Sequence, residues 1–401
     1  MAMRISLTRA IRTAILGLAL VLAAAPAASA QGTLSALQTD VDQIARRARP
    51  SVVTVFALRT EAVAKAAASA APVPPRVRTR VGSGVAVDEH LVLTTASVVL
   101  EAERLLVSTA NGLQVEAEIV GVDPVFNLAL LSVPTLRLPP IRFAAARSAR
   151  VGDWVISLGT SYNAQPTQSL GNVAQRHREP GQALLQLTNT VYPGNSGAAA
   201  LNIHGELVGL VTGELGFPAL SGGDADADRG PGGASFAMPV ESLRPVLESL
   251  KTQGRVRHGY LGVKTLAASL ESDREGGPST PIGALVEGII GGSPAQRVGL
   301  RPGDLIVAFD GERVETPDQL ARWVLATPPG RTVTIVWVRR EVGYNGAVVL
   351  NESPERVPAW LAGAGADPPE EPHKVAELDR EIRRLSQELD RQRDATGSPP
   401  R

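Results

Sequence analysis

The chain has 401 residues, of which 44% are hydrophobic and only 3% aromatic, and it contains no cysteine. This length predicts two or three domains, and the lack of cysteine excludes disulfides, thiol catalysis, cysteine-ligated zinc and a lipidated N-terminal cysteine. The 40 basic and 40 acidic residues balance, so the composition does not support a nucleic-acid-binding protein, which needs a basic excess on one domain.

The N-terminus has the order of a secretory signal peptide. Three Arg residues precede an apolar run over residues 14–25, and Ala28-Ser29-Ala30 supplies small residues for cleavage after Ala30. The run is short for a bilayer span, although an uncleaved anchor is the alternative. Removing residues 1–30 leaves 37 basic and 40 acidic residues, a net charge of −3. We therefore expect an exported, periplasmic protein with no stable membrane span after cleavage.

The next segment predicts a helix, a strand and a loop. Residues 34–47 carry apolar side chains at helical spacing, which indicates a short amphipathic helix. Ser51 to Ala57 (SVVTVFA) is rich in β-branched residues and predicts a strand. From Arg59 to Arg80 the chain is rich in Ala and Pro. Such a segment has little to bury, so we expect a mobile loop there.

Short β-type runs separated by Gly, Asn, Asp or Pro then fill the chain as far as residue 213. These runs are VGSGVAV, LVLTTASVV, LLVSTA, LQVEAEIVGVD, LALLSV, WVISLG, ALLQLT and ELVGLVTG. Their close spacing predicts an all-β barrel or sandwich rather than βαβ units.

The stretch TVYPGNSGAAALNIHGELVGLVT, residues 190–212, contains a Gly-rich turn. Two Gly residues bracket Asn195-Ser196, so the backbone can turn sharply and leave a serine hydroxyl exposed. A serine beside consecutive backbone N–H groups is how acyl-transfer enzymes build an oxyanion hole. An ordinary β-turn that happens to contain Ser is the alternative.

Residues 222–233 (GGDADADRGPGG) have the composition of a flexible insertion. Its alternating Asp residues resemble a calcium loop, but Arg229 stands where the sixth position needs Gly, and Ser235 where the twelfth needs Glu. A solvated acidic loop is the preferred interpretation, and we expect no metal or other cofactor. Residues 241–252 then predict a helix with Leu243, Val246, Leu247 and Leu250 on one face.

Several motifs in register resemble the HtrA/Deg family, in which a trypsin-like serine protease domain precedes a PDZ domain. They are GSGVAVDEHLVLTTASVV, VGVDPVFNLALLSV, YPGNSGAAALNIHGELVGLVTG, SFAMPVESLRPVL and HGYLGV, and the match covers roughly residues 35–340. The resemblance implies a mainly β fold. Two packed six-stranded β-barrels over residues 31–252 would be followed by an α+β PDZ domain over 256–345.

The family's chemistry needs a Ser, His and Asp triad, and the resemblance places only the serine. Ser196 matches the nucleophile and Gly194 the oxyanion hole. The family histidine lies within a Thr-Asn-x-His-Val pattern that follows a strand. Here that segment is Thr94-Thr95-Ala96-Ser97-Val98, so Ser97 stands at the histidine position. The family aspartate precedes Leu-Ala-x-Leu, but here Asn127 does. The turn also reads Gly-Asn-Ser-Gly-Ala-Ala-Ala instead of ending in Gly-Pro-Leu, and Thr188 replaces an Asp.

These changes predict a pseudoprotease. A serine hydroxyl cannot act as a general base near neutral pH, and an asparagine has no charge to stabilise an imidazolium. Two rescues stay open: another histidine, or a lysine base. His90, His177 and His204 fall on predicted turns, however, and the four Lys residues lie far from these motifs in sequence.

The PDZ-like unit contains a candidate peptide site. His258-Gly259-Tyr260-Leu261-Gly262-Val263 resembles the PDZ carboxylate-binding loop, whose N–H groups bind a peptide C-terminus while the next strand pairs with the peptide. We expect a helix over 294–298, a turn at Gly303-Asp304, a strand over 305–309 and a helix over 317–326. TVTIVWVRR should close the sheet. A blocked groove is the alternative.

The C-terminus divides into a Pro/Gly-rich linker over 346–372 and a helical segment over 373–395. Val375, Leu378, Ile382, Leu385 and Leu389 form a short heptad seam. It is too short to be stable alone. It would reinforce an oligomer, a trimer by the family resemblance, or pack back onto its own chain.

The sequence therefore predicts an exported HtrA-like PDZ protein whose barrels are a scaffold. Its PDZ domain would bind C-terminal or extended peptide segments, as a chaperone-like protein or as the regulator of an active relative by mixed assembly. A working serine endopeptidase with a non-standard base is the alternative function.

Overall fold

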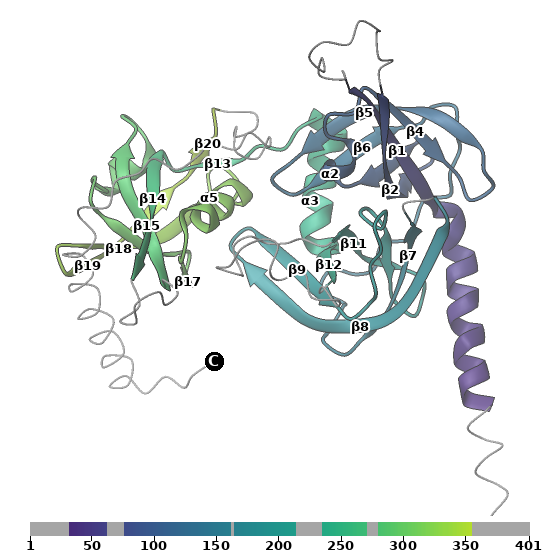
Figure 1. Ribbon diagram of the computed structural model, residues 1–401. Helices are drawn as coiled ribbons and strands as arrows, with labels where there is room; N and C mark the ends of the chain where they lie inside the picture. Colours follow the sequence, from purple (N-terminus) through teal and green to yellow (C-terminus); the bar gives the residue numbers. More distant parts are fainter. Residues whose placement is uncertain (1–31, 62–75, 162–163, 214–234, 271–279, 355–401) are drawn as a thin grey trace, which may run out of the picture.

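The computed structural model describes residues 32–61, 76–161, 164–213, 235–270 and 280–354 (Figure 1). The expected signal peptide, the acidic insertion and the C-terminal heptad segment lie outside these residues. Among the residues described, no helix has the length and hydropathy of a membrane-spanning segment.

The first domain opens with a helix over residues 32–48, longer by a few residues than the helix predicted over 34–47. Its second half packs against the barrels, with Ile44, Ala45 and Ala48 buried, whereas Leu34 near its start is 69% exposed. The 3-10 turn η1 (Arg49–Ser51) then leads into the first strand.

Six antiparallel strands close the first barrel in the order β1-β2-β3-β6-β5-β4. They are β1 (Val52–Glu61), β2 (Arg76–Asp88), β3 (Leu91–Thr94), β4 (Arg104–Ser108), β5 (Gln114–Asp123) and β6 (Leu128–Ser132). The short helix α2 (Ala96–Val99) follows β3. Inward-facing aliphatic side chains such as Val55, Val107 and Leu131 are fully buried in its core, as the alternation along the strands predicts.

A second barrel closes in the order β10-β11-β12-β9-β8-β7. Its strands are β7 (Trp154–Thr160), β8 (Pro166–Glu179), β9 (Gln182–Leu187), β10 (Ala199–Leu201), β11 (Leu207–Gly213) and β12 (Ser235–Pro239). The expectation of two packed six-stranded barrels is therefore confirmed.

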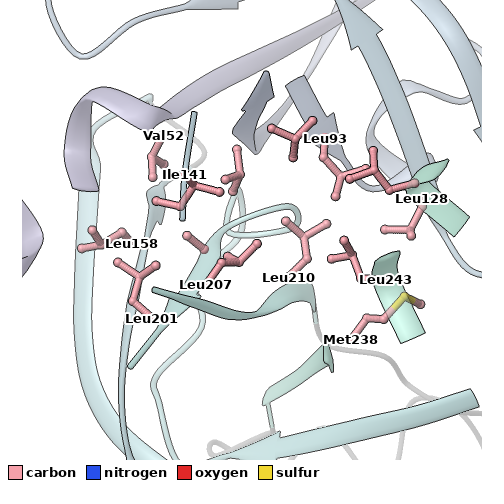
Figure 2. Packing of buried hydrophobic residues seen from close by; sticks show 14 of the residues in the cluster. Val52, Leu93, Leu128, Ile141, Leu158, Leu201, Leu207, Leu210, Met238 and Leu243 are labelled. Carbon is pink, nitrogen blue, oxygen red and sulfur yellow. The ribbon is translucent and has the colours of Figure 1, made fainter. Parts of the chain in front are cut away.

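One apolar cluster joins the two barrels (Figure 2). Leu93 and Leu128 come from the first barrel, and Leu158 and Leu210 from the second, and all four are fully buried. Helix α3 (Val240–Gln253) adds Leu243 to the same cluster, and its four predicted apolar residues are buried. Because burial of each such side chain contributes about 1.5–3 kcal/mol, this interface fixes the two barrels in one arrangement.

The C-terminal domain is a small sheet with two helices. Its main sheet has the order β14-β15-β16-β18-β19. The strands are β13 (Gly259–Tyr260), β14 (Val263–Leu270), β15 (Thr280–Ile289), β16 (Leu305–Phe309), β17 (Glu312–Arg313), β18 (Thr332–Arg339), β19 (Val342–Val349) and β20 (Asn351–Glu352). Helices α4 (Pro294–Val298) and α5 (Pro317–Ala326) lie where the sequence predicts them.

Three details differ from the sequence predictions. β1 runs to Glu61 and β2 starts at Arg76, because β1 pairs with β2 along its whole length. Residues 59–61 and 76–80 of the expected loop are therefore strand, and residues 62–75 lie outside the described part of the chain. β18 does not close the sheet, since β19 pairs along its outer side. The last strands thus continue past residue 345 to Glu352.

Candidate functional site

The serine turn is held by the side chain of Asn195, which is buried. Its Nδ2 donates to the carbonyl of Thr160 at 2.8 Å and to the Thr167 hydroxyl at 2.7 Å. Its Oδ1 accepts the N–H of Tyr192 at 2.8 Å. A buried amide with its donors and acceptor all used is strongly fixed, so Asn195 ties the turn to the second barrel.

Ser83 in β2 ties the same turn to the first barrel. Its hydroxyl donates to the carbonyl of Gly194 at 2.7 Å and accepts the N–H of Thr160 at 2.9 Å. Its own N–H donates to the carbonyl of Ser196 at 2.8 Å. Sequence reasoning missed this residue, although its Gly-Ser-Gly setting resembles that of Ser196. The turn therefore lies at the junction of both barrels.

The two glycines of the turn have conformations that few other residues adopt. Gly194 has φ 100° and Gly197 has φ 88°, in the region that favours glycine. A Cβ on Gly197 would lie 2.0 Å from the carbonyl oxygen of Ser83 and 2.8 Å from the Thr94 hydroxyl. The turn thus packs directly against β2 and the end of β3, three residues before Ser97.

Ser196, the expected nucleophile position, has a half-buried side chain. Its hydroxyl has no hydrogen-bond partner among the described residues. Within the same part of the chain, the N–H groups of Gly194 and Ser196 also have no acceptor. Two such donors beside a serine are what an oxyanion hole uses.

Ser97 and Asn127, the residues that the resemblance places at the histidine and aspartate positions, lie in contact with each other. The N–H of Ser97 donates to Asn127 Oδ1 at 2.8 Å. The Ser97 hydroxyl, which is exposed, donates to the hydroxyl of buried Thr95 at 3.2 Å. Asn127 has φ 52°, a left-handed conformation that Asn and Asp tolerate best. The pair supplies neither an imidazole nor a carboxylate.

None of the four described histidines lies at this pair. His90 is exposed and lies on a turn, as predicted, and its Nδ1 hydrogen-bonds the carbonyl of Leu136. His204 lies in the turn before β11. The prediction that His177 lies on a turn is wrong. His177 lies within β8, because this strand continues to Glu179. The fifth histidine, His373, lies outside the described residues.

His258 joins the two domains instead. It is 5% exposed, and its Nε2 lies 2.7 Å from Oδ2 of Asp123, which is 2% exposed. Its Nδ1 lies 3.0 Å from the carbonyl of Leu325 in α5. Burial by itself lowers the pKa of His258, but the hydrogen bond and charge of Asp123 and the Leu325 carbonyl outweigh it and raise the pKa. Both ring nitrogens are occupied, so His258 has none left to act as a base.

The candidate peptide loop lies at the start of the open edge strand of the C-terminal sheet. Leu261 is buried, and Gly262 has φ 82°. Within the described chain, the N–H groups of these two residues have no acceptor. Among the described residues β14 pairs with β15 alone, so its other edge can accept an added strand. Helix α5 contacts β13 and β14 and so lies beside this loop.

The described residues contain no group of three or more His, Asp or Glu side chains placed to hold a metal ion. The acidic insertion with its calcium-like spacing is outside them.

Comparison with known proteins agrees with this architecture. A trypsin-like peptidase domain matches residues 82–210, and a PDZ domain matches residues 285–339. A probable periplasmic serine endoprotease DegP-like of Hahella chejuensis is 30% identical over 285 residues, which cover 70% of this chain and 59% of the relative. The protein of the same description from Chlamydia trachomatis serovar D is 32% identical, covering 68% of this chain and 54% of the relative. The chain thus spans little more than half the length of these relatives.

Two solved structures resemble this fold over most of the chain. A variant of the HtrA-type protease AlgW with a decapeptide has a TM-score of 0.59 at 25% identity, covering 79% of this chain and 99% of that one. The serine endoprotease from Yersinia pestis has a TM-score of 0.53 at 27% identity, covering 78% of this chain and 98% of that one. With two barrels, a PDZ domain and these relatives, the chain belongs to the HtrA family.

Proposed function

We propose that this chain is a pseudoprotease of the HtrA family, whose barrels act as a scaffold and whose PDZ domain binds C-terminal or extended peptide segments. The observation that carries the proposal is the pair formed by Ser97 and Asn127. Their hydrogen bond links a backbone N–H to an amide oxygen. Neither side chain of this pair can accept a proton from Ser196 near neutral pH.

The chemistry of peptide hydrolysis explains why this pair matters. The proton of the nucleophilic serine must be transferred to a base whose pKa lies near the working pH. The pKa of a serine hydroxyl, such as that of Ser97, lies far above this pH. An asparagine amide cannot offset the positive charge of a protonated base. In a well-studied serine protease, loss of the serine or the histidine alone lowers turnover about a millionfold. We therefore expect no useful turnover.

A chain that keeps the protease fold but has no histidine at the position of the general base is expected to act by binding. The open edge of β14 and the unpaired N–H groups at Leu261 and Gly262 support capture of a peptide carboxylate. The similar AlgW structure was solved with a decapeptide, and the named relatives are periplasmic. We propose a periplasmic protein that holds unfolded chains, or that regulates an active relative within a homo- or mixed oligomer.

A working endopeptidase is the second candidate function. The Ser196 hydroxyl and the N–H groups of Gly194 and Ser196 have no partner within the described residues, as an intact oxyanion hole requires. A non-standard base, such as one from another copy of the chain, would then complete the site.

Labelling with a fluorophosphonate probe separates the two functions. A serine with a base reacts rapidly, because the probe mimics an acylating substrate. We expect the wild-type chain and Ser196→Ala to label equally slowly. Rapid labelling of the wild type that disappears in Ser196→Ala would overturn the pseudoprotease proposal.

A further inference from the structure

A cavity of about 590 Å³ lies between the two domains, away from the serine turn. Its walls come from the β8–β9 hairpin, one side of helix α3, and the segment that follows α5. The hairpin and α5 are in close contact, since a Cβ on Gly181 would lie 2.5 Å from the carbonyl of Ala326. This volume is that of an ordinary small-ligand site.

The lining of the cavity is strongly basic. Five arginines and two glutamates contribute to it, and no lysine does. The arginines are Arg147, Arg176, Arg178, Arg257 and Arg331, and the acids are Glu179 and Glu241.

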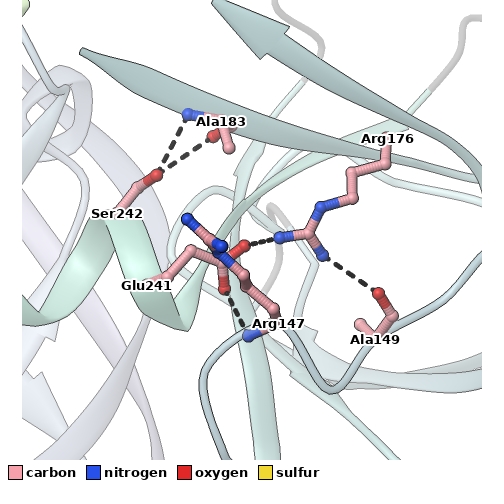
Figure 3. A network of polar contacts seen from close by, with 6 residues as sticks. All are labelled: Arg147, Ala149, Arg176, Ala183, Glu241 and Ser242. Atoms are coloured by element: carbon pink, nitrogen blue, oxygen red, sulfur yellow. Dashed lines mark hydrogen bonds and ion pairs between the residues drawn. The ribbon is translucent and has the colours of Figure 1, made fainter.

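Both acids are already used by the protein. Glu241 accepts the N–H of Arg147 at 3.2 Å and pairs with the Arg176 guanidinium (Figure 3). Glu179 accepts the indole N–H of Trp323 at 3.0 Å. The negative charge in the cavity wall is therefore bound to fixed partners.

Arg176 shows that positive charge is in excess here. Its guanidinium also donates to the carbonyl of Ala149 at 3.0 Å, and its buried Nε has no hydrogen-bond partner among the described residues (Figure 3). Desolvation, followed by repulsion from Arg178 and Arg147, lowers the pKa of Arg176 despite its glutamate partner. A buried donor left unpaired is costly and points to a missing acceptor.

Two of the arginines, Arg147 and Arg178, have guanidinium groups with no acidic partner in the described part of the chain. The others differ in this respect: Arg331 pairs with Asp310 at 2.6 Å, and Arg257 lies 3.9 Å from Glu352. Arg147 and Arg178 are both exposed, so their charges are available to a ligand.

We propose that this interdomain cavity, here called the arginine cavity, binds a compact multivalent phosphate such as a short polyphosphate or a phosphorylated metabolite. The guanidinium fork matches the geometry of a phosphate group and binds it through two parallel hydrogen bonds. This site is separate from the peptide loop and from Ser196, and it stands independently of the pseudoprotease proposal.

An extended acidic peptide fits the arginine cavity less well. Peptides bind sheets by adding a strand to an open edge, but β8 already pairs with β7 and β9, and β9 also pairs with β12. The walls therefore offer charge to a compact anion and no free strand edge to a peptide.

The test uses the full chain without its signal segment. Tripolyphosphate is the probe, and calorimetry at constant ionic strength measures its binding. We expect saturable binding to one site. The double variant Arg147→Ala/Arg178→Ala should weaken it by about tenfold for each guanidinium removed. The matched control, Arg46→Ala/Arg313→Ala, removes two exposed arginines outside the cavity and should bind as the wild type does.

Three results would overturn the proposal. The first is a cavity double variant that binds tripolyphosphate as tightly as the wild type does. The second is a control variant that loses as much affinity as the cavity double variant, which would indicate a general charge effect. An Asp/Glu-rich decapeptide that binds more tightly than tripolyphosphate would assign the cavity to acidic peptides. Melting curves of both variants without tripolyphosphate check that any loss of binding does not come from unfolding of the variant.

Discussion

At the scale of single residues, Gly197 decides whether the serine turn can form. Its φ of 88° and the 2.0 Å approach of the Ser83 carbonyl leave no room for a side chain. We expect Gly197→Ala to lower the free energy of unfolding by about 3 kcal/mol or more, through both strain and overlap. A urea titration of the two proteins measures the difference.

Gly112 supplies the matched control for that substitution. It has φ 81°, yet a Cβ there would meet nothing within 4 Å. Gly112→Ala should therefore cost only the strain of the backbone, about 1 kcal/mol. If the two variants lose the same stability, contact between Gly197 and Ser83 is not what limits the turn.

The sequence motifs predicted the turn residues but not the contacts that hold them. The resemblance placed Ser97 at the family's histidine position and Asn127 at its aspartate position, and the structure brings the two residues into hydrogen-bond contact at 2.8 Å. Ser83 could not be inferred, because its role depends on the packing of β2 against a turn 111 residues away. His177 was wrongly placed on a turn, since the charged residues Arg176 and Arg178 beside it hide the apolar alternation of β8.

At the scale of secondary structure, β14 offers the free edge on which a peptide would pair. Leu266, in the middle of this strand, is 38% exposed. We expect Leu266→Asp to weaken binding of a C-terminal peptide library by about tenfold, because a charge would replace an apolar contact beside the added strand. Fluorescence anisotropy with the selected peptides measures it.

Val342 is the control for this prediction. It is 53% exposed on β19, the strand at the opposite edge of the same sheet. Val342→Asp should leave peptide binding unchanged. Equal loss in both variants would mean that peptides do not pair specifically with β14, and no loss in either would favour a blocked groove.

The elements themselves were largely predictable, and the errors have physical causes. Helix α3 and helix α5 follow from apolar spacing, and the buried face of α3 is the predicted one. β19 was missed because VGYNGAVV has two glycines and little apolar alternation. Its pairing comes from the neighbouring strand β18 rather than from its own residues.

At the scale of the whole molecule, the two domains meet through a titratable contact. The two acceptors around His258, Asp123 Oδ2 and the Leu325 carbonyl, can both be satisfied only by an imidazolium. The pKa of His258 is raised in the folded chain. Its contribution to stability is thus complete below the unfolded pKa and is lost as the pH rises through the folded pKa.

We therefore expect the stability difference between wild type and His258→Gln to be larger at about pH 5.5 than at about pH 8.5. Urea titrations at the two pH values measure this difference, and small-angle scattering follows the separation of the domains. A difference that is constant with pH, or that grows on the alkaline side, would contradict the imidazolium contact.

For the whole molecule, we propose that the barrels are a scaffold and that Ser196 does not hydrolyse peptide bonds. The most direct test of this proposal is the degradation of casein by wild type and by Ser196→Ala, with Ser97→His/Asn127→Asp as a variant in which a triad is rebuilt. The proposal predicts the same background cleavage for wild type and Ser196→Ala. Casein cleavage by the wild type that Ser196→Ala abolishes would contradict it.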